Sequence, residues 1–288
     1  MVRACLLSVA VLAPALGQAA DAGALRARHA ALSERLADNP FGRPLHVESD
    51  DGAGAHEGDV YAVIDQPYGV VAPALARPDS WCEILMLQVN ARRCEAPGTG
   101  AAPTVTALIT RKAREPVEKA YRVEFRYQLA GTAPDYVRVA LTAREGPLGT
   151  RDYRIRVEAA PLDGERTFLH LSYAYELGLM ARLAVNAYLA TSGRDKVGFT
   201  MVEGGDGRPV RIDGARGLIE RGAMRHYLAI EAFLDSLDEP ASRRLEARLR
   251  DWYAAIERYP QLREAIGEQE YVEMKRGAAA GVTSGGGA

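Results

Sequence analysis

The segment from Ala215 to Leu237 constrains the fold more than any other stretch, because it is long, amphipathic and near the end of the chain. Its apolar side chains recur at steps of three and four residues, which places them on one face of an α-helix. From about Tyr61 to Val202 the chain consists largely of short segments of alternating apolar and polar residues, which are typical of strands. We therefore expect an α+β fold in which a curved antiparallel sheet wraps around this helix. The helical stripe consists of Ile219, Ala223, Tyr227, Ile230, Leu234 and Leu237.

Five strands of an antiparallel meander are predicted between Pro103 and Tyr175. Glycine, proline and aspartate separate them at hairpin distances. The segment Pro44–Ser49 is a candidate edge strand. A strand at Asp59–Asp65 and two short helices broken around Pro78 precede the meander, with the first helix starting near Ala72, because Pro73 fits a first turn best. The segment Lys196–Glu203 predicts one more strand. The inward set of the meander is rich in tyrosine: Tyr121, Val123, Phe125, Tyr127, Leu129, Val137, Val139, Leu141, Tyr153, Ile155, Val157, Leu169, Leu171, Tyr173 and Tyr175.

The N-terminus is typical of a cleaved secretory signal. Arg3 precedes an apolar run, Leu6–Leu16, that is too short to span a membrane, and small residues follow it up to Ala22. We expect residues 1–20 to be removed and the mature protein to be periplasmic or secreted. The alternative, a buried N-terminal helix, would have to accommodate a basic residue and a proline.

Two cysteines remain after this cleavage, Cys82 and Cys94. An even number in an exported chain predicts a disulfide between them, and two buried free thiols are the alternative. Their spacing excludes a CxxC redox centre, and no Cys/His cluster predicts a zinc site.

Charge argues against a nucleic-acid partner. Loss of Arg3 leaves 35 Lys and Arg against 38 Asp and Glu, without a basic cluster that alternates with stacking aromatics. No later segment reaches the roughly 18 apolar residues of a membrane span, while contact with a membrane surface stays open. The oligomeric state is not predicted.

Five parts are expected along the chain. They are a signal peptide (1–20), an N-terminal helix and loop (21–58), a ligand-binding domain (59–237), a C-terminal helical extension (238–276) and a disordered tail (277–288). An extra helix near 177–191, rich in small residues, is either a mobile lid or an ordinary packing helix.

The element order resembles the helix-grip fold of the START-like (SRPBCC) superfamily: a strand, two short helices, a meander and a long C-terminal helix. The resemblance covers roughly Asp59 to Leu237, and the segment DVYAVIDQPYGVV supports it, since members often have a strand leading into the first helix there. It implies a cavity under the long helix that holds a hydrophobic molecule such as a lipid, a sterol or an aromatic compound. It implies no catalytic residue and no cofactor.

Nine residues are therefore candidates to contact a ligand. These nine are Tyr121, Tyr127, Tyr153, Tyr173, Tyr175, Ile219, Ala223, Tyr227 and Ile230. The competing interpretation is that the tyrosines simply fill the core.

Charged residues near the start of the long helix offer further chemistry. If Glu220 pairs with one of Arg221 and Arg225, the other arginine is free to anchor an acidic head group, although structural ion pairs are the plainer interpretation. His226 lies beside the apolar stripe, and His170 lies on the charged face of its strand.

Three functional hypotheses follow. The first is an exported carrier or sensor of a hydrophobic small molecule. The second is an enzyme of the cyclase or hydrolase type that uses the same cavity, with tyrosines or His226 as acid and base. The third is a structural or interaction protein with a filled core.

Overall fold

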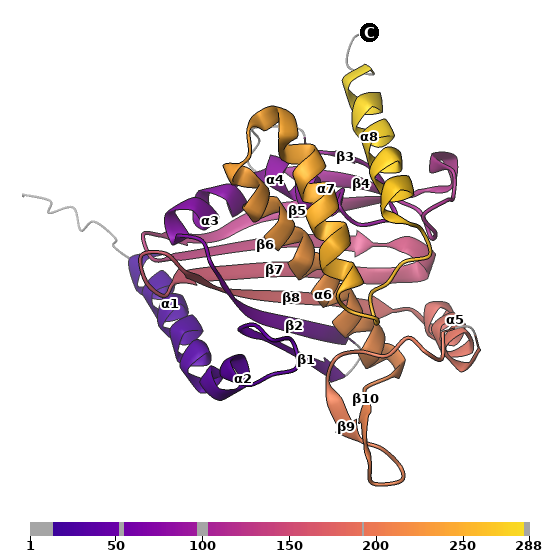
Figure 1. The fold of residues 1–288 in the computed structure, drawn as a ribbon, viewed down its shortest axis with the longest axis horizontal. Coiled ribbons are helices and arrows are strands. Elements are labelled where there is room, and N and C mark those ends of the chain that lie inside the picture. The colour runs from indigo at the N-terminus through magenta and orange to yellow at the C-terminus, as the bar shows by residue number, and fades with distance from the viewer. Residues whose placement is uncertain (1–13, 52–54, 97–102, 192, 285–288) are drawn as a thin grey trace, which may run out of the picture.

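An eight-stranded antiparallel sheet forms the centre of the molecule. The computed structural model describes residues 14–51, 55–96, 103–191 and 193–284. The strands run in the order β1-β2-β8-β7-β6-β5-β4-β3, and all neighbours are antiparallel (Figure 1). The five predicted strands of the meander are all present. The sheet comprises β1 (Leu45–Asp51), β2 (Ala55–Ile64), β3 (Ala91–Glu95), β4 (Thr104–Ile109), β5 (Tyr121–Ala133), β6 (Tyr136–Glu145), β7 (Thr150–Pro161) and β8 (Thr167–Leu177).

The long helix α6 (Gly214–Asp235) crosses one face of the sheet, as the amphipathic pattern predicts. Its tightest approach is at Gly58 of β2, where a side chain would not fit. A Cβ atom there would lie 3.1 Å from the carbonyl oxygen of Ile219 and 3.3 Å from the Cβ of Ala223. The helix and the curved sheet together form the expected α+β helix-grip fold.

Further helices complete the layer over α6. The short helices α3 (Tyr68–Leu75) and α4 (Pro78–Leu85) follow β2, and Trp81 of α4 is fully buried. Helix α7 (Ala241–Glu257) packs against α6 through a stripe that includes Trp252. Helix α8 (Glu268–Ser284) packs against α7 and the edge strand β3, where the Tyr271 hydroxyl donates a hydrogen bond to the Leu87 carbonyl.

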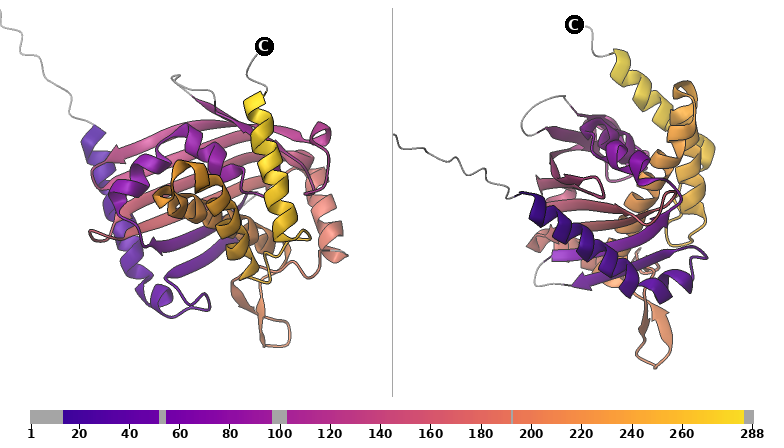
Figure 2. Two further views of the ribbon diagram at one scale, coloured as in Figure 1. Left: turned by 45° about the horizontal axis from the view of Figure 1, so that its top comes forward. Right: turned by 90° about the vertical axis from the view of Figure 1, so that its left-hand side faces the viewer.

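Helices α1 (Pro14–Ala31) and α2 (Ser33–Ala37) lie against one end of the opposite face of the sheet, as Figure 2 shows. Leu25 and Leu36 pack with Tyr61 and Phe168 in a second, smaller core. Strand β2 is therefore buried on both faces, as its continuous apolar run predicts.

His170 lies on this face of the sheet and is partly buried rather than solvated. Its Nε2 lies 2.7 Å from Asp59 Oδ1 and its Nδ1 lies 3.2 Å from Glu158 Oε2, while the ring stacks on Tyr61 at 4.3 Å. Since carboxylates only accept hydrogen bonds, this arrangement suits the doubly protonated imidazolium.

The expected edge strand at Pro44–Ser49 is present as β1, which pairs with β2 along its length, so the sheet begins at Leu45, within the part expected as an N-terminal helix and loop. Two expectations about element boundaries are wrong. Helix α3 starts at Tyr68 and contains Pro73, because the carbonyl that proline leaves without a donor belongs to exposed Gly69. The predicted strand at Lys196–Glu203 is only the short strand β9 (Met201–Glu203), which pairs with β10 (Pro209–Arg211) outside the main sheet.

The C-terminal tail also differs from expectation. Helix α8 continues to Ser284 through a segment expected to be disordered, because the three alanines from Ala278 to Ala280 have the highest helix propensity. Residues 285–288 of the expected tail, and the first 13 residues of the expected signal, lie outside the described part of the chain. Among the residues that the structure describes, no helix is long and apolar enough to cross a membrane.

The predicted disulfide is present and joins α4 to β3. The Cα atoms of Cys82 and Cys94 are 5.3 Å apart. The bond closes a loop of 12 residues at the edge of the sheet, next to the contacts that hold α8.

Replacing Cys82 and Cys94 together by serine should lower the free energy of unfolding by about 3 kcal/mol, because the open chain gains loop entropy. Urea denaturation measures this loss, and reduction of the wild-type protein by dithiothreitol should reproduce it. An unchanged denaturation midpoint in both experiments would contradict a stabilising role for the bond.

Candidate functional site

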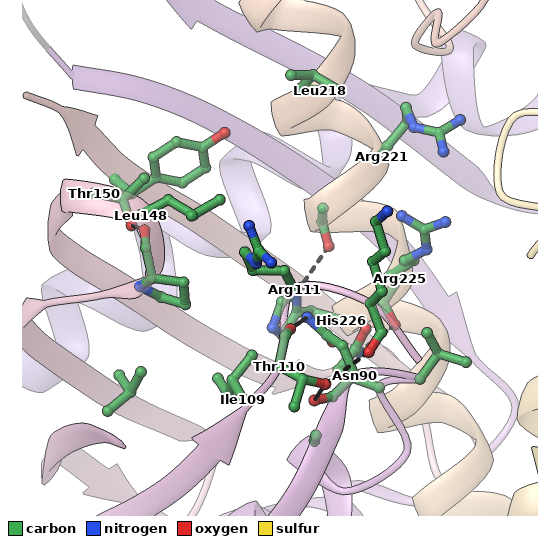
Figure 3. Close-up of a pocket in the computed structure, with 18 of the residues that line it drawn as sticks. Asn90, Ile109, Thr110, Arg111, Leu148, Thr150, Leu218, Arg221, Arg225 and His226 are labelled. Carbon is green, nitrogen blue, oxygen red and sulfur yellow. Dashed lines mark hydrogen bonds between the residues drawn. The ribbon is translucent and has the colours of Figure 1, made fainter. Parts of the chain in front are cut away.

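A cavity of about 710 Å³ lies between the sheet, α6 and α5 (Leu179–Ala190). Strands β4, β5, β7 and β8 supply one wall and α6 supplies another, while the segments at 88–91 and 264–266 close it (Figure 3). The apolar part of the wall includes Leu85, Ala107, Ile109, Val123, Phe125, Ile155, Leu177, Val185 and Ile266.

The side of α6 that lines the cavity is not the apolar stripe. It consists of Leu218, Arg221, Gly222, Arg225 and His226, which also follow helical spacing but are rotated around the helix axis from the stripe. Arg221 and Arg225 extend from the same side of α6 in Figure 3. The helix therefore packs on the sheet with one side and faces the cavity with its neighbouring side.

Three of the predicted ligand-contacting residues line the cavity together: Tyr153, Tyr173 and Tyr175. Their rings form a cluster with centroid distances of 5.3 Å for Tyr153–Tyr175 and 5.8 Å for Tyr173–Tyr175. Burial raises the pKa of all three hydroxyls, so they are neutral donors. The Tyr153 hydroxyl lies 2.8 Å from Thr150 Oγ1, whereas those of Tyr173 and Tyr175 make no hydrogen bond to any described residue.

The other three predicted tyrosines lie outside the cavity lining. Tyr127 is buried and donates a hydrogen bond to the Ala76 carbonyl at 2.6 Å. Tyr227 is fully buried, and its hydroxyl donates to Glu231 and accepts from Arg43 at 2.8 Å. Tyr121 is half-buried at the start of β5.

Ile219, Ala223 and Ile230 also lie outside the lining. All three are fully buried, and Ala223 and Ile230 belong to the main hydrophobic core. Of the nine predicted contacts, the structure thus gathers three at the cavity and places six in the surrounding framework.

His226 is held at the cavity by its neighbours. Its ring stacks on Tyr173 at 4.5 Å, and its Nδ1 donates to the Gly222 carbonyl at 2.8 Å. A carbonyl can only accept, so Nδ1 carries the proton and Nε2 is left as an acceptor. Burial lowers the pKa of His226 to about 4, although the hydrogen bond to Gly222 opposes this shift.

Glu220 pairs with neither arginine of α6. Its carboxylate is fully buried and accepts hydrogen bonds from the Ser49 hydroxyl at 2.7 Å and from the backbone N–H groups of Phe199 at 2.6 Å and Thr200 at 2.9 Å. Its role is structural, because it ties α6 to β1 and to the segment before β9.

Arg225 pairs with Glu264, a residue after α7, and not with Glu220. Its Nη2 donates to Glu264 at 2.5 Å and to the Leu262 carbonyl at 2.9 Å. Its Nε is buried and has no partner among the described residues.

Arg221 is 5 % exposed and makes no hydrogen bond or ion pair with a described residue. Burial and the positive charge of Arg225 lower its pKa to about 10, while Glu264 opposes the shift. Arg221 therefore stays charged at neutral pH. Lys196 lines the cavity beside these arginines, and burial and both guanidinium charges lower its pKa as well.

Helix α5 is the least buried wall of the site. Leu179 and Met180 are 74 % and 75 % exposed, and only Ala181 of this helix is buried. Val185 and Tyr188 face the cavity.

Sequence reasoning weighed the cationic side of α6 but missed Lys196 and the segments at 88–91 and 264–266. The sequence carries one local signal for this side of the cavity, which is the spacing of four residues between Arg221 and Arg225 next to the apolar stripe of α6. The residues at 264–266 follow α7 and reach the cavity through a turn that local patterns do not predict.

No protein-family model matches the chain, and no curated protein matches it. Among solved structures, it is similar to norcoclaurine synthase from Thalictrum flavum in complex with dopamine and hydroxybenzaldehyde (15 % identity, TM-score 0.33, 52 % of this chain and 80 % of that one). It is also similar to the Zhui aromatase/cyclase from Streptomyces sp. R1128, at 15 % identity and a TM-score of 0.37, over 70 % of this chain and 98 % of that one. A conserved protein of unknown function from Enterococcus faecalis matches at 10 % identity and a TM-score of 0.32, over 83 % of this chain and 91 % of that one. At these TM-scores the likeness carries no argument about function.

The pKa values of the two partly buried histidines, His170 and His226, should be shifted in opposite directions. The pKa of His226 is lowered to about 4, so its neutral ring contributes stability above pH 6.5 that is lost as the pH falls through 4. Burial opposes protonation of His170, but the hydrogen bonds that its ring donates to Asp59 and Glu158 outweigh it and raise its pKa. Its contribution is complete below pH 6.5 and is lost as the pH rises through the raised value.

An NMR titration of the histidine ring signals measures both values, with His170→Gln and His226→Gln as assignment variants. At pH 6 we expect the His170 ring to be protonated and the His226 ring to be neutral. A single transition near pH 6.5 for both rings would show that neither site is arranged as described.

Proposed function

We propose that this protein binds a hydrophobic or amphiphilic small molecule in the cavity between the sheet and α6. The observation that carries the proposal is the cavity itself, whose 710 Å³ lies within the roughly 300–1,000 Å³ typical of small-molecule sites. A structural protein with a filled core has no need for such a space, which argues against the third hypothesis.

The composition of the wall supports an amphiphile. Aliphatic side chains and three tyrosine rings supply apolar contact area, while the hydroxyls of Tyr173 and Tyr175 and the His226 Nε2 supply a few polar groups that lack partners among the described residues. Polar groups in such positions orient a ligand, because leaving them unpaired costs free energy.

Filling the cavity should abolish binding. Val185 faces the cavity from α5, and Val185→Trp should lower the affinity for the neutral fluorescent probe N-phenyl-1-naphthylamine at least tenfold by excluding it from the space. Fluorescence titration measures the dissociation constant. Because α5 is weakly packed, the fold should tolerate the larger side chain.

Leu183→Trp is the matched control. Leu183 lies two residues away on the same helix but is 56 % exposed and does not line the cavity, so its variant should bind the probe as the wild type does. Equal probe binding by wild type and Val185→Trp would rule out this cavity as the binding site.

We further propose that the chain is exported and cleaved near residue 20. The Cys82–Cys94 disulfide supports an oxidising compartment. Residues from Asp21 onward contact the sheet, since Asp21 pairs with Arg138 at 3.1 Å and Ala22 is buried. Intact-mass analysis of the protein from a periplasmic fraction should give a chain that lacks about 20 residues, with no free thiol; a full-length chain with free thiols would contradict export.

A further inference from the structure

The charged residues of the cavity wall are strongly unbalanced. Among the described residues, six cationic side chains line it and Glu264 is the single carboxylate. Two of the cations are neutralised from outside, because Arg111 pairs with Glu115 at 2.9 Å and Arg114 pairs with Glu270 at 2.6 Å. The remaining cations are Lys112, Lys196, Arg221 and Arg225.

Arg221 is the member of this set that most requires an anion. Arg225 already has Glu264, whereas Arg221 is removed from water without any carboxylate or carbonyl partner among the described residues. A buried, unpaired charge is costly, and the cost is recovered when a complementary charge enters.

We propose that the cavity selects amphiphiles that carry one singly charged anionic group, a carboxylate or a sulfonate, and that Arg221 binds this group with Lys196 beside it. The inference rests on the proposed function, since it assigns a ligand class to the same cavity. The planar guanidinium donates two parallel hydrogen bonds to such an oxyanion.

The position of Arg221 also places the apolar part of the ligand. Gly222 follows it on α6, and a Cβ atom there would lie 2.7 Å from the Tyr173 ring, so the helix contacts that tyrosine directly. The tail of a ligand whose head group meets Arg221 therefore extends over Tyr173 and Tyr175 towards Ile155 and Phe125 of the sheet. The neutral tyrosine hydroxyls add donors without adding negative charge that would repel the head group.

Two probes with one scaffold separate charge from apolar contact. N-Phenyl-1-naphthylamine is neutral, and 8-anilinonaphthalene-1-sulfonate carries the same rings with one sulfonate. The folded wild-type protein should bind both at one site per chain, the sulfonate at least tenfold more tightly. Arg221→Gln should weaken sulfonate binding by about tenfold to a hundredfold, the range for a hydrogen bond to a charged group, and leave the neutral probe within twofold.

Arg208→Gln is the control for net charge, because Arg208 lies on the β9–β10 hairpin with its side chain 84 % exposed. It should bind both probes as the wild type does. Thermal unfolding is a second readout: loss of an unpaired buried charge should leave the Arg221→Gln midpoint at or above that of the wild type. If that variant nevertheless fails to fold, Lys196→Gln tests the same charge preference on a half-buried residue.

A natural head group is tested by displacement of the neutral probe. Dodecanoate should displace it at lower concentration than 1-dodecanol in the wild type, and the two should be equal in Arg221→Gln. If both naphthalene probes bind the wild type equally, or if Arg221→Gln weakens both to the same extent, the anion preference is overturned and the proposed function stands. If neither probe binds the wild type, the proposed function itself fails.

Discussion

The seating of α6 on β2 is the contact on which the rest of the structure depends. Gly58 removes the side chain that would otherwise hold the helix away, so the backbone of Ile219 and the methyl group of Ala223 rest directly on the strand. The close approach is at one side of the sheet, where β1, β2 and β8 meet the helix. Towards β4 and β5 the helix and the sheet separate, and the space between them is the cavity.

This geometry explains why charged residues coexist with a hydrophobic pocket. The side of α6 that packs on the sheet has to be apolar, because its atoms lose all contact with water. The neighbouring side faces the cavity, and there Arg221, Arg225 and His226 are retained. Arg225 is compensated by Glu264 from the segment after α7, and Arg221 is not compensated by a described residue. Positive charge is thus in excess on the wall of the cavity, where the molecule has room for a ligand.

Much of the fold could be predicted from the sequence, because the signals involved are local. The alternation in β5 through β8 and the stripe of α6 each report one buried face, and the element order then limits the arrangement. The disulfide was predictable because Cys82 and Cys94 are the two cysteines that remain once the expected signal peptide, which contains Cys5, is removed. The edge strand at Leu45 was also predictable, whereas its pairing with β2 depends on a turn that carries no strong local signal.

The cavity was harder to predict, for a physical reason. An amphipathic stripe identifies the residues that lose contact with water, and these are the residues that fill space rather than line it. Ile219, Ala223 and Ile230 illustrate this, since all are fully buried in the framework. The tyrosines divide because position along the strand, and not only the face, decides which neighbours a ring meets. Tyr127 reaches the Ala76 carbonyl, whereas Tyr153, Tyr173 and Tyr175 line the cavity, where Tyr173 also contacts α6 at Gly222 and His226.

The buried carboxylate of Glu220 has a mechanical consequence. By accepting from Ser49 on the edge strand and from two amides ahead of the β9–β10 hairpin, it fastens two segments to the first half of α6 at one point. Sliding or rotating the helix would break all of these bonds together, so the helix and the sheet act as a fixed frame. Helix α5 is held by none of these bonds, and Ala181 is its single buried residue.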